Sequence, residues 1–193
     1  MVLSMDRWVG KVAIVTGASS GIGAVIAEQL VDNGLQVVAL ARRKDRLHEL
    51  AVKLAGKKGK VYPVKADLSK EEDILNAFKW TKENVGPVHI LINNAGTTDR
   101  VRLTDASTES YNKIIQLNVI GLCIATREAV RDMKANNVDG HIIHINSVLG
   151  HQVLGFPSSV YSASKFAVTA LAETLRLELN SLKSKIKITV RLN

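Results

Sequence analysis

The chain has 193 residues, of which 46% are hydrophobic and 23% charged, and its 26 basic and 18 acidic side chains give a formal net charge of +8. This composition is typical of a globular protein long enough to bury a core, and it excludes disordered and collagen-like chains. We expect no transmembrane helix, because no stretch of about 18 consecutive apolar residues occurs, and the N-terminus lacks the apolar core of a secretory signal.

Apolar runs that resemble strands alternate with helical patterns along the whole chain. The predicted strands are Val12–Thr16, Gln36–Leu40, Lys60–Val64, His89–Asn93, His141–Asn146 and Lys187–Arg191. The predicted helices are about Gly21–Asn33, Arg43–Leu54, Lys70–Val85, Ser107–Ala135 and Ser159–Leu182. This alternation favours an α/β fold with a doubly wound parallel sheet and helices on both faces. We expect a single domain over residues 1–193.

A glycine-rich turn follows the first predicted strand. It reads Thr16-Gly17-Ala18-Ser19-Ser20-Gly21-Ile22-Gly23 and leads into a helical pattern. Strand, turn and helix in this order are the context of a dinucleotide fingerprint, whose glycines permit a tight turn, close approach of backbone to a pyrophosphate and close helix packing. The spacing is Gly-x-x-x-Gly-x-Gly rather than the commoner Gly-x-Gly-x-x-Gly, and a purely structural turn stays open as the alternative. We expect cofactor contacts from Gly17, Ser19, Ser20, Gly21, Ile22 and Gly23.

Two arginines follow the second predicted strand, in the run Ala39-Leu40-Ala41-Arg42-Arg43. An acidic residue at this point would hydrogen-bond the ribose 2′-hydroxyl of NAD, whereas arginine accommodates the 2′-phosphate of NADP. The planar guanidinium groups of Arg42 and Arg43 therefore predict NADP(H) as the cofactor. The alternative is that both arginines only begin the next helix on its solvent face.

Tyr161 and Lys165 stand four residues apart in the last predicted helix, and Ser147 stands fourteen residues before Tyr161. Positions i and i+4 share one helix face, so the phenol and the ammonium would lie side by side. A cation about 4 Å away can lower the pKa of a phenol by about three units, which would let Tyr161 exchange a proton near neutral pH. The alternative is a packed tyrosine beside a solvated lysine.

Five motifs occur in the order and rough spacing of the short-chain dehydrogenase/reductase family, in its classical branch. They are the glycine-rich run 16–23, Asn93-Asn94-Ala95-Gly96, Asn118-Val119, Ser147 and Tyr161-x-x-x-Lys165. The resemblance covers about residues 10–191. The chain is also similar to the farnesol dehydrogenase-like group of insects and to the related broad-range carbonyl reductases.

The resemblance implies a Rossmann-like fold and hydride transfer between the nicotinamide of NADP(H) and an alcohol or carbonyl carbon. It implies that Tyr161 exchanges a proton with the substrate oxygen and that Ser147 hydrogen-bonds the same oxygen. Lys165 would lower the pKa of Tyr161 and hold the nicotinamide ribose, and the resemblance implies that Tyr161 and Lys165 both contact the cofactor. Asn118 would steady a water between Lys165 and solvent, at a kink in the long helix 107–135.

Further cofactor contacts follow from the resemblance. Asp67 and Leu68 come after the third predicted strand, where the family places an aspartate that meets the adenine edge. Asn94, Ala95 and Gly96 come after the fourth strand, at the edge where open α/β sheets bind ligands. Asn93 is expected to brace the sheet. Their alternative is an ordinary loop, since asparagine and glycine are common there.

The sequence stops at Asn193, where the family continues beyond its sixth strand. We therefore expect six strands without the seventh, and 187–191 as a bare sheet edge. A second hypothesis is a catalytically silent, truncated member that binds NADP(H) or a partner without turnover. The resemblance also implies a homodimer or homotetramer formed through the helices 107–135 and 159–182.

The segment Val148–Pro157 is unusually apolar for a loop. If it lines the mouth of the site, the substrate is lipophilic, such as a terpenoid alcohol, a steroid or a retinoid-like carbonyl; packing against helices is the alternative.

The basic residues are mixed with acids along the chain, which favours solvated helix faces over a nucleic-acid site. We expect no metal site, because the spacing of His141 and His144 puts them on opposite faces of a strand. Cys123 is the only cysteine, which predicts the cytoplasm as the compartment.

Overall fold

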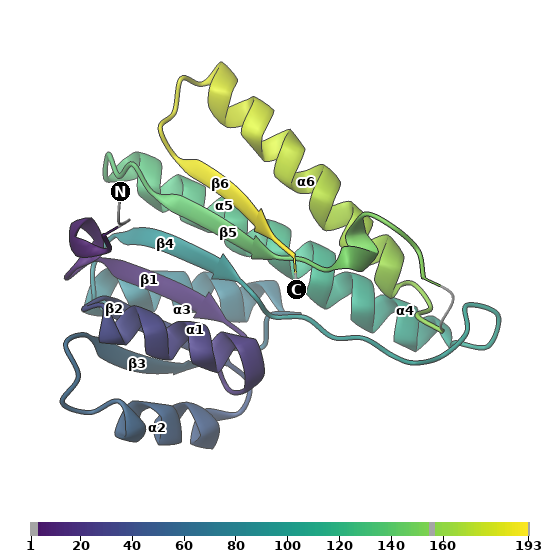
Figure 1. The fold of residues 1–193 in the computed structure, drawn as a ribbon, viewed down its shortest axis with the longest axis horizontal. Helices are drawn as coiled ribbons and strands as arrows, with labels where there is room; N and C mark the ends of the chain where they lie inside the picture. The colour runs from purple at the N-terminus through teal and green to yellow at the C-terminus, as the bar shows by residue number, and fades with distance from the viewer. Residues whose placement is uncertain (1–3, 155–156, 193) are drawn as a thin grey trace.

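The computed structural model describes residues 4–154 and 157–192, and six strands in them form one parallel sheet. The strand order is β3-β2-β1-β4-β5-β6, which Figure 1 shows from the purple β1 outward. This is the order of a doubly wound, Rossmann-like sheet, in which the connections reverse direction between β1 and β4. The strands are β1 Val12–Thr16, β2 Gln36–Ala41, β3 Lys60–Lys65, β4 Val88–Asn93, β5 His141–Ile145 and β6 Lys187–Arg191. The predicted fold class is confirmed.

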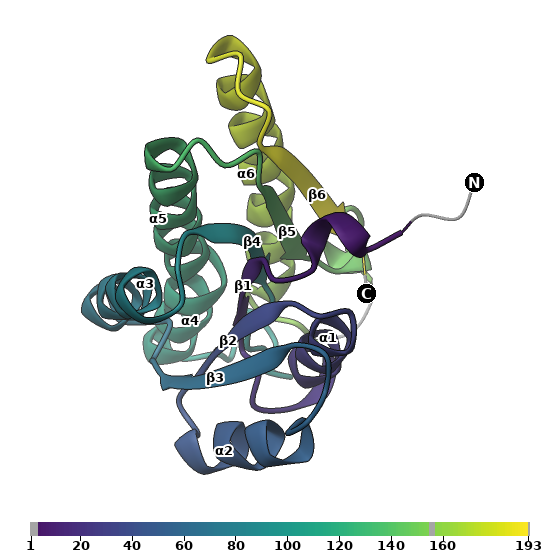
Figure 2. The same cartoon turned by 90° about the vertical axis from the view of Figure 1, so that its left-hand side faces the viewer.

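Helices pack on both faces of the sheet, and Figure 2 shows α3 and α5 on one side and α1 on the other. The helices are α1 Gly21–Asp32, α2 Lys44–Lys53, α3 Glu71–Asn84, α4 Thr108–Ile115, α5 Leu122–Ala135 and α6 Tyr161–Ser181. Side chains alternate across β1: Val12 and Ile14 join the core with α3, α5 and α6, whereas Ala13 and Val15 join the core with α1 and α2. β1 is therefore buried on both sides, as its continuous apolar sequence predicts.

The long helix predicted over residues 107–135 is interrupted. A π-helical segment, Gln116–Gly121, separates α4 from α5, and Asn118 lies inside it. Short π-helical segments inside α-helices occur frequently at functional sites. A Cβ atom on Gly121 would collide with the backbone oxygen of Leu68, so glycine permits this segment to approach the loop after β3. The kink expected near Asn118 is thus a change of helix type.

The C-terminal elements depart from the prediction in small ways. Helix α6 begins at Tyr161, two residues later than predicted, because Ser159 has a left-handed backbone with φ of 44°. In the described part of the chain, strand β6 pairs with β5 alone and lies at the edge of the sheet. No helix in the described part of the chain combines the length and the apolar character needed to cross a membrane.

Candidate active site

The glycine-rich turn connects β1 to α1 and packs against the residues that follow β4. Gly17 has φ of 70°, and a Cβ atom there would lie 2.9 Å from the Cα atom of Ala95. A Cβ atom on Gly23 would lie 2.5 Å from the backbone oxygen of Gly17 and would also collide with the side-chain amide of Asn94. Gly21 has φ of 55° and open space around it. Close packing thus requires glycine at 17 and 23, and a left-handed backbone favours glycine at 17 and 21.

The hydroxyl of Thr16 joins the ends of β1 and β4. It accepts hydrogen bonds from the backbone N–H groups of Asn94 at 3.0 Å and Ala95 at 2.9 Å, and it donates to the carbonyl of Ile92 at 3.2 Å. The side-chain amide of Asn94 donates to the carbonyl of Thr16 at 2.9 Å. These bonds hold both strand ends where the sheet reverses direction, which is where ligands bind in open α/β sheets.

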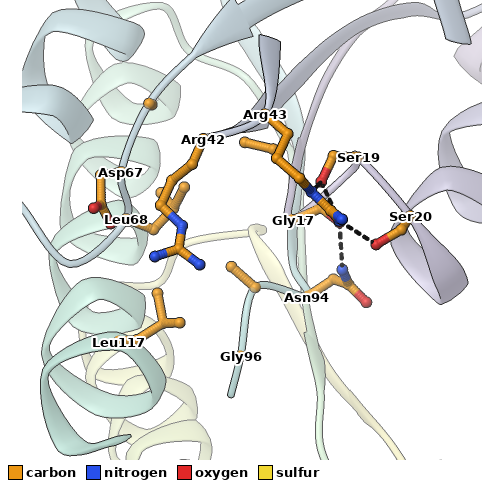
Figure 3. Close-up of a pocket in the computed structure, with 13 residues that line it drawn as sticks. Gly17, Ser19, Ser20, Arg42, Arg43, Asp67, Leu68, Asn94, Gly96 and Leu117 are labelled. Carbon is orange, nitrogen blue, oxygen red and sulfur yellow. Dashed lines mark hydrogen bonds between the residues drawn. The ribbon is translucent and has the colours of Figure 1, made fainter. Parts of the chain in front are cut away.

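A cavity of about 470 Å³ opens at these strand ends (Figure 3). Its lining includes the following residues that the sequence predicts for cofactor binding: Gly17, Ser19, Ser20, Arg42, Arg43, Asp67, Leu68, Asn94, Ala95 and Gly96. Gly21, Ile22, Gly23, Tyr161 and Lys165 do not line it. The structure therefore brings together residues from the ends of four strands, as the parallel order requires.

Arg42 and Arg43 lie on one side of this cavity (Figure 3). The guanidinium group of Arg43 donates to the hydroxyl of Ser19 at 2.9 Å and to that of Ser20 at 2.6 Å. Arg43 is the N-cap residue of α2, which begins at Lys44, and both arginines are exposed to solvent at the rim of the cavity. Two cations and two hydroxyls thus face a cavity at a glycine-rich turn, an arrangement suited to phosphate.

Asp67 lines the cavity next to Arg42 (Figure 3), and its pKa is lowered. Burial acts to raise the pKa of this carboxyl, but hydrogen bonds from Ser69 and the charges of Arg42 and Lys70 outweigh burial. The hydroxyl of Ser69 donates to the carboxylate at 2.7 Å and its backbone N–H at 3.1 Å. Asp67 is therefore an ionised hydrogen-bond acceptor at neutral pH.

Tyr161 and Lys165 lie on one face of α6, with the amine of Lys165 5.7 Å from the centre of the Tyr161 ring. Lys165 is 8% exposed and donates to the carbonyl of Ile145, at the end of β5, at 3.0 Å. Ser147 follows two residues later, and its hydroxyl interacts with the phenol of Tyr161 in the sense that lowers the pKa of that phenol. The structure brings these three side chains together between the end of β5 and the first turns of α6, and their catalytic roles stay a prediction.

The expected lowering of the Tyr161 pKa is not found in the protein alone. Burial raises the pKa of the phenol, and the hydrogen bond with Ser147 opposes this only in part. Burial also lowers the pKa of Lys165. The prediction assumed a cation about 4 Å from the phenol, whereas the amine is turned toward the Ile145 carbonyl, so its charge does not offset the cost of desolvating the phenolate.

Asn118 links the cavity to this group of side chains. Its amide donates to the carbonyl of Thr97 at 2.9 Å and to the hydroxyl of Ser164 at 3.0 Å, and its oxygen accepts from the backbone N–H of Thr97 at 2.8 Å. Ser164 is the residue before Lys165, and Thr97 follows Gly96 of the cavity lining. Its expected role in holding a water beside Lys165 stays a prediction.

Asn93 lies in the sheet below the cavity, where it is 4% exposed. Its amide donates to the hydroxyl of Thr126 at 2.9 Å and contacts Nδ1 of His144 at 3.1 Å, a bracing arrangement of the kind expected. Burial, together with the charge of Lys165, lowers the pKa of His144 to about 4. Among residues 4–154 and 157–192, no three histidine, cysteine or acidic side chains are grouped as metal ligands.

Sequence reasoning missed three residues of the lining: Ala41, Ala66 and Leu117. Ala41 ends β2 and Ala66 directly follows β3. Their position at the carboxyl ends of parallel strands could have indicated them, although their small side chains carry no chemistry. Leu117 lies in the π-helical segment beside Asn118, which the sequence did not predict.

Comparisons with known proteins fit this geometry. A family model described as short chain dehydrogenase matches residues 11–191. The chain belongs to this family. It is 48% identical to a farnesol dehydrogenase of Aedes aegypti over 188 residues, which are 96% of this chain and 77% of that protein.

Solved structures of the family share the fold. A short chain dehydrogenase/reductase of Burkholderia phymatum in complex with NAD superimposes with a TM-score of 0.90 at 31% identity, over 97% of this chain and 66% of that one. The L-sorbose reductase of Gluconobacter frateurii, complexed with NADPH and L-sorbose, gives 0.88 at 33% identity, over 96% and 70%. The chain thus spans between about two thirds and three quarters of the length of these three relatives.

The low pKa of His144 predicts a loss of stability in mild acid. An unfolded histidine binds a proton near its ordinary pKa of 6.5, whereas the folded one binds it only near 4. The unfolded state therefore holds more protons between these values, and the free energy of unfolding decreases by up to roughly 3 kcal/mol as the pH falls through this window.

Urea unfolding at about pH 7, 6 and 5 measures this effect. The variant His144→Asn should lose part of the pH dependence, whereas His48→Asn, an exposed residue of α2, should retain it. Identical pH dependence in His144→Asn and the unaltered protein would contradict the prediction.

Proposed function

We propose that this short chain dehydrogenase is an NADP(H)-dependent oxidoreductase that transfers hydride between the nicotinamide and a lipophilic alcohol or carbonyl, with Tyr161 as the acid and base. The observation that carries the proposal is the convergence of Ser147, Tyr161 and Lys165 beside Asn118, which contacts the loop of the glycine-rich cavity. A polarising hydroxyl, a proton donor and a buried cation are the groups that carbonyl reduction requires.

The described residues fit a dinucleotide. Gly17, Ser19 and Ser20 of the turn line the cavity, and Arg42 and Arg43 supply positive charge beside the turn. When bound, the nicotinamide supplies or accepts the hydride. For reduction, the hydroxyl of Ser147 would hydrogen-bond the carbonyl oxygen of the substrate while Tyr161 gives its proton to that oxygen. Alcohol oxidation reverses the proton transfer.

Lys165 serves this chemistry as a buried positive charge. It lies on the same helix face as Tyr161 and is held at the carbonyl of Ile145. In the protein alone this charge does not lower the pKa of Tyr161. We propose that it stabilises the phenolate once cofactor and substrate are bound. We propose that Lys165 also binds the nicotinamide ribose and that Asn118 holds a water beside it.

Removing the phenol oxygen should abolish turnover without preventing cofactor binding. We expect Tyr161→Phe to lower kcat by about 10²- to 10⁴-fold, the range of general acid and base catalysis, with the Kd for NADPH nearly unchanged. Ketone reduction and farnesol oxidation, followed through NADPH absorbance, measure kcat.

The matched control is Tyr62→Phe, which removes a hydroxyl that bonds Gln36 on β2, far along the sequence from the site. Full activity in Tyr161→Phe would refute the catalytic assignment. Quenching of cofactor fluorescence by the unaltered protein without turnover would instead favour the second candidate, a silent NADP(H)-binding protein, to which the raised pKa of Tyr161 also points.

The preference for NADP(H) over NAD(H) rests on Arg42 and Arg43. Arg43 is pre-oriented by two hydroxyls of the glycine-rich turn, so little side-chain freedom is lost on binding a phosphate. We expect Arg42→Ala and Arg43→Ala each to weaken NADPH binding by about 10- to 100-fold, the worth of hydrogen bonds to a charged group, and to affect NADH far less.

Isothermal titration with both cofactors tests this preference. Arg46→Ala is the control, since Arg46 lies on α2 and pairs with Glu49 at 3.0 Å outside the cavity. Tighter binding of NADH than NADPH by the unaltered protein would overturn the assignment.

A lipophilic substrate is proposed from the segment between Ser147 and Tyr161. Val148, Val153 and Leu154 are 39%, 72% and 38% exposed, and Gly155 and Phe156 of this apolar run lie outside the described residues. Exposed apolar side chains beside a polar reaction centre favour a substrate with an apolar body. The similarity to a farnesol dehydrogenase supports the same choice.

We also propose that the protein forms a homodimer or homotetramer through α5 and α6. We propose the cytoplasm as its compartment. A hollow of about 300 Å³ between these helices is lined by Leu122, Val130, Leu171 and Leu175 together with polar residues. We expect sedimentation equilibrium to give a dimer or tetramer, and charged substitution of Leu171 to shift it toward monomer. A monomer at all concentrations would count against this assembly.

A further inference from the structure

Three residues of α6 share the face that turns toward β5. Tyr161, Lys165 and Thr169 stand at i, i+4 and i+8, so their side chains lie above one another. The hydroxyl of Ser147 lowers the pKa of Tyr161, and Lys165 donates to the carbonyl of Ile145. Thr169 continues this row, and the chemistry proposed above gives it no role.

The hydroxyl of Thr169 on α6 bonds one residue before Ser147 in the sequence and one residue after it. Its proton is shared between the carbonyl of Gly150 at 2.9 Å and the carbonyl of Lys165 at 3.3 Å. Its oxygen accepts a hydrogen bond from the side-chain amide of Asn146 at 2.9 Å. A hydroxyl has one proton and two lone pairs, so these partners use its donor completely. One side chain therefore holds the residue before Ser147 and the end of the short 3₁₀ turn Val148–Gly150 after it.

Asn146 is kept at this position despite an energetic cost. It is 2% exposed, its backbone N–H donates to the carbonyl of Arg191 at 2.8 Å, and its side-chain oxygen is buried with no partner among the described residues. A buried acceptor without a partner is unfavourable, and native proteins retain such groups mainly where they serve a site. The side-chain NH₂ group of Asn146, by contrast, donates a hydrogen bond to the hydroxyl of Thr169.

Close packing leaves the segment 146–150 little freedom to shift relative to α6. A Cβ atom on Gly150 would lie 2.6 Å from the carbonyl oxygen of Lys165 and 2.7 Å from the amide nitrogen of Asn146. The hydroxyl of Ser147 accepts from the backbone N–H of Leu149 at 3.2 Å, inside the same turn. A shift of the turn relative to α6 would therefore move the Ser147 hydroxyl relative to the phenol of Tyr161.

We propose that Asn146 and Thr169 are positioning residues that hold Ser147 against Tyr161 by fastening the segment 146–150 to the catalytic face of α6. This inference rests on the proposed function, because it assigns both residues to the same reaction. Neither residue touches the substrate; both act through Ser147.

Replacing Thr169 by valine removes the hydroxyl and keeps the shape. We expect Thr169→Val to lower kcat by about 10- to 100-fold, the size of effect that small misplacement of catalytic groups produces, with the Kd for NADPH unchanged. Thr169→Ser, which keeps the hydroxyl, should recover most of the loss. The double variant Asn146→Ala with Thr169→Val should lose no more than the worse single variant, because both changes break one link.

Thr81→Val is the matched control. Thr81 is a buried threonine of α3 whose hydroxyl donates only to the carbonyl of Ala77, four residues earlier, at 2.7 Å. We expect its kcat to equal that of the unaltered protein. A Thr169→Val variant with full kcat, or a Thr169→Ser variant as slow as Thr169→Val, would overturn the inference.

A second measurement is independent of turnover. The groups that face the phenol of Tyr161 are Ser147 from the segment after β5 and Lys165 from α6. The protein has three tyrosines, so ¹³C-ring-labelled tyrosine, with Tyr161→Phe for assignment, gives the titration midpoint of this phenol by NMR.

The midpoint should rise in Thr169→Val, since the hydrogen bond from Ser147 that lowers the pKa is weakened, and it should not move in Thr81→Val. An unchanged midpoint overturns the positioning role whether or not the protein turns over. Absence of turnover in the unaltered protein, with the midpoint shifted as expected, would count against the proposed function alone.

Discussion

Close contact between the glycine-rich turn and the chain after β4 determines where the site forms. Gly17 and Gly23 leave no room for a side chain against Ala95 and Asn94. The hydroxyl of Thr16 then fastens both backbones with two accepted hydrogen bonds. Because β1 and β4 are neighbours only through the reversal of strand order, this contact fixes the crevice at the sheet's carboxyl edge. The arginines after β2 and the carboxylate after β3 face the crevice as a consequence of the parallel order.

Features that depend on local chemistry could be predicted from the sequence. The strands and most helices agree with the structure to within one or two residues, because buried parallel strands are continuously apolar and helices repeat every 3.6 residues. The helical spacing of Tyr161 and Lys165 was sufficient to place both on one face. The grouping of the arginines with the glycine-rich turn followed from sheet topology alone.

Features that depend on three-dimensional surroundings could not be predicted. The π-helical segment arises where Gly121 meets the Leu68 carbonyl, a contact between residues distant in sequence. The direction of the Tyr161 pKa follows from burial and from where the Lys165 amine is turned, neither of which the spacing reveals. The hydrogen bond from Asn146 to Thr169 joins a strand end to a helix, and neither residue type predicts this pairing from the sequence.

Strand β6 presents alternating exposed side chains, among them Lys187 and Arg191, and within residues 4–154 and 157–192 its backbone pairs on one side only. Cationic side chains on an outer strand discourage the addition of another chain, because two such edges brought together would place like charges opposite each other. Dissolved ions weaken this repulsion, with a screening length of about 10 Å at 0.1 M salt. The repulsion that such charges contribute therefore weakens as the ionic strength rises.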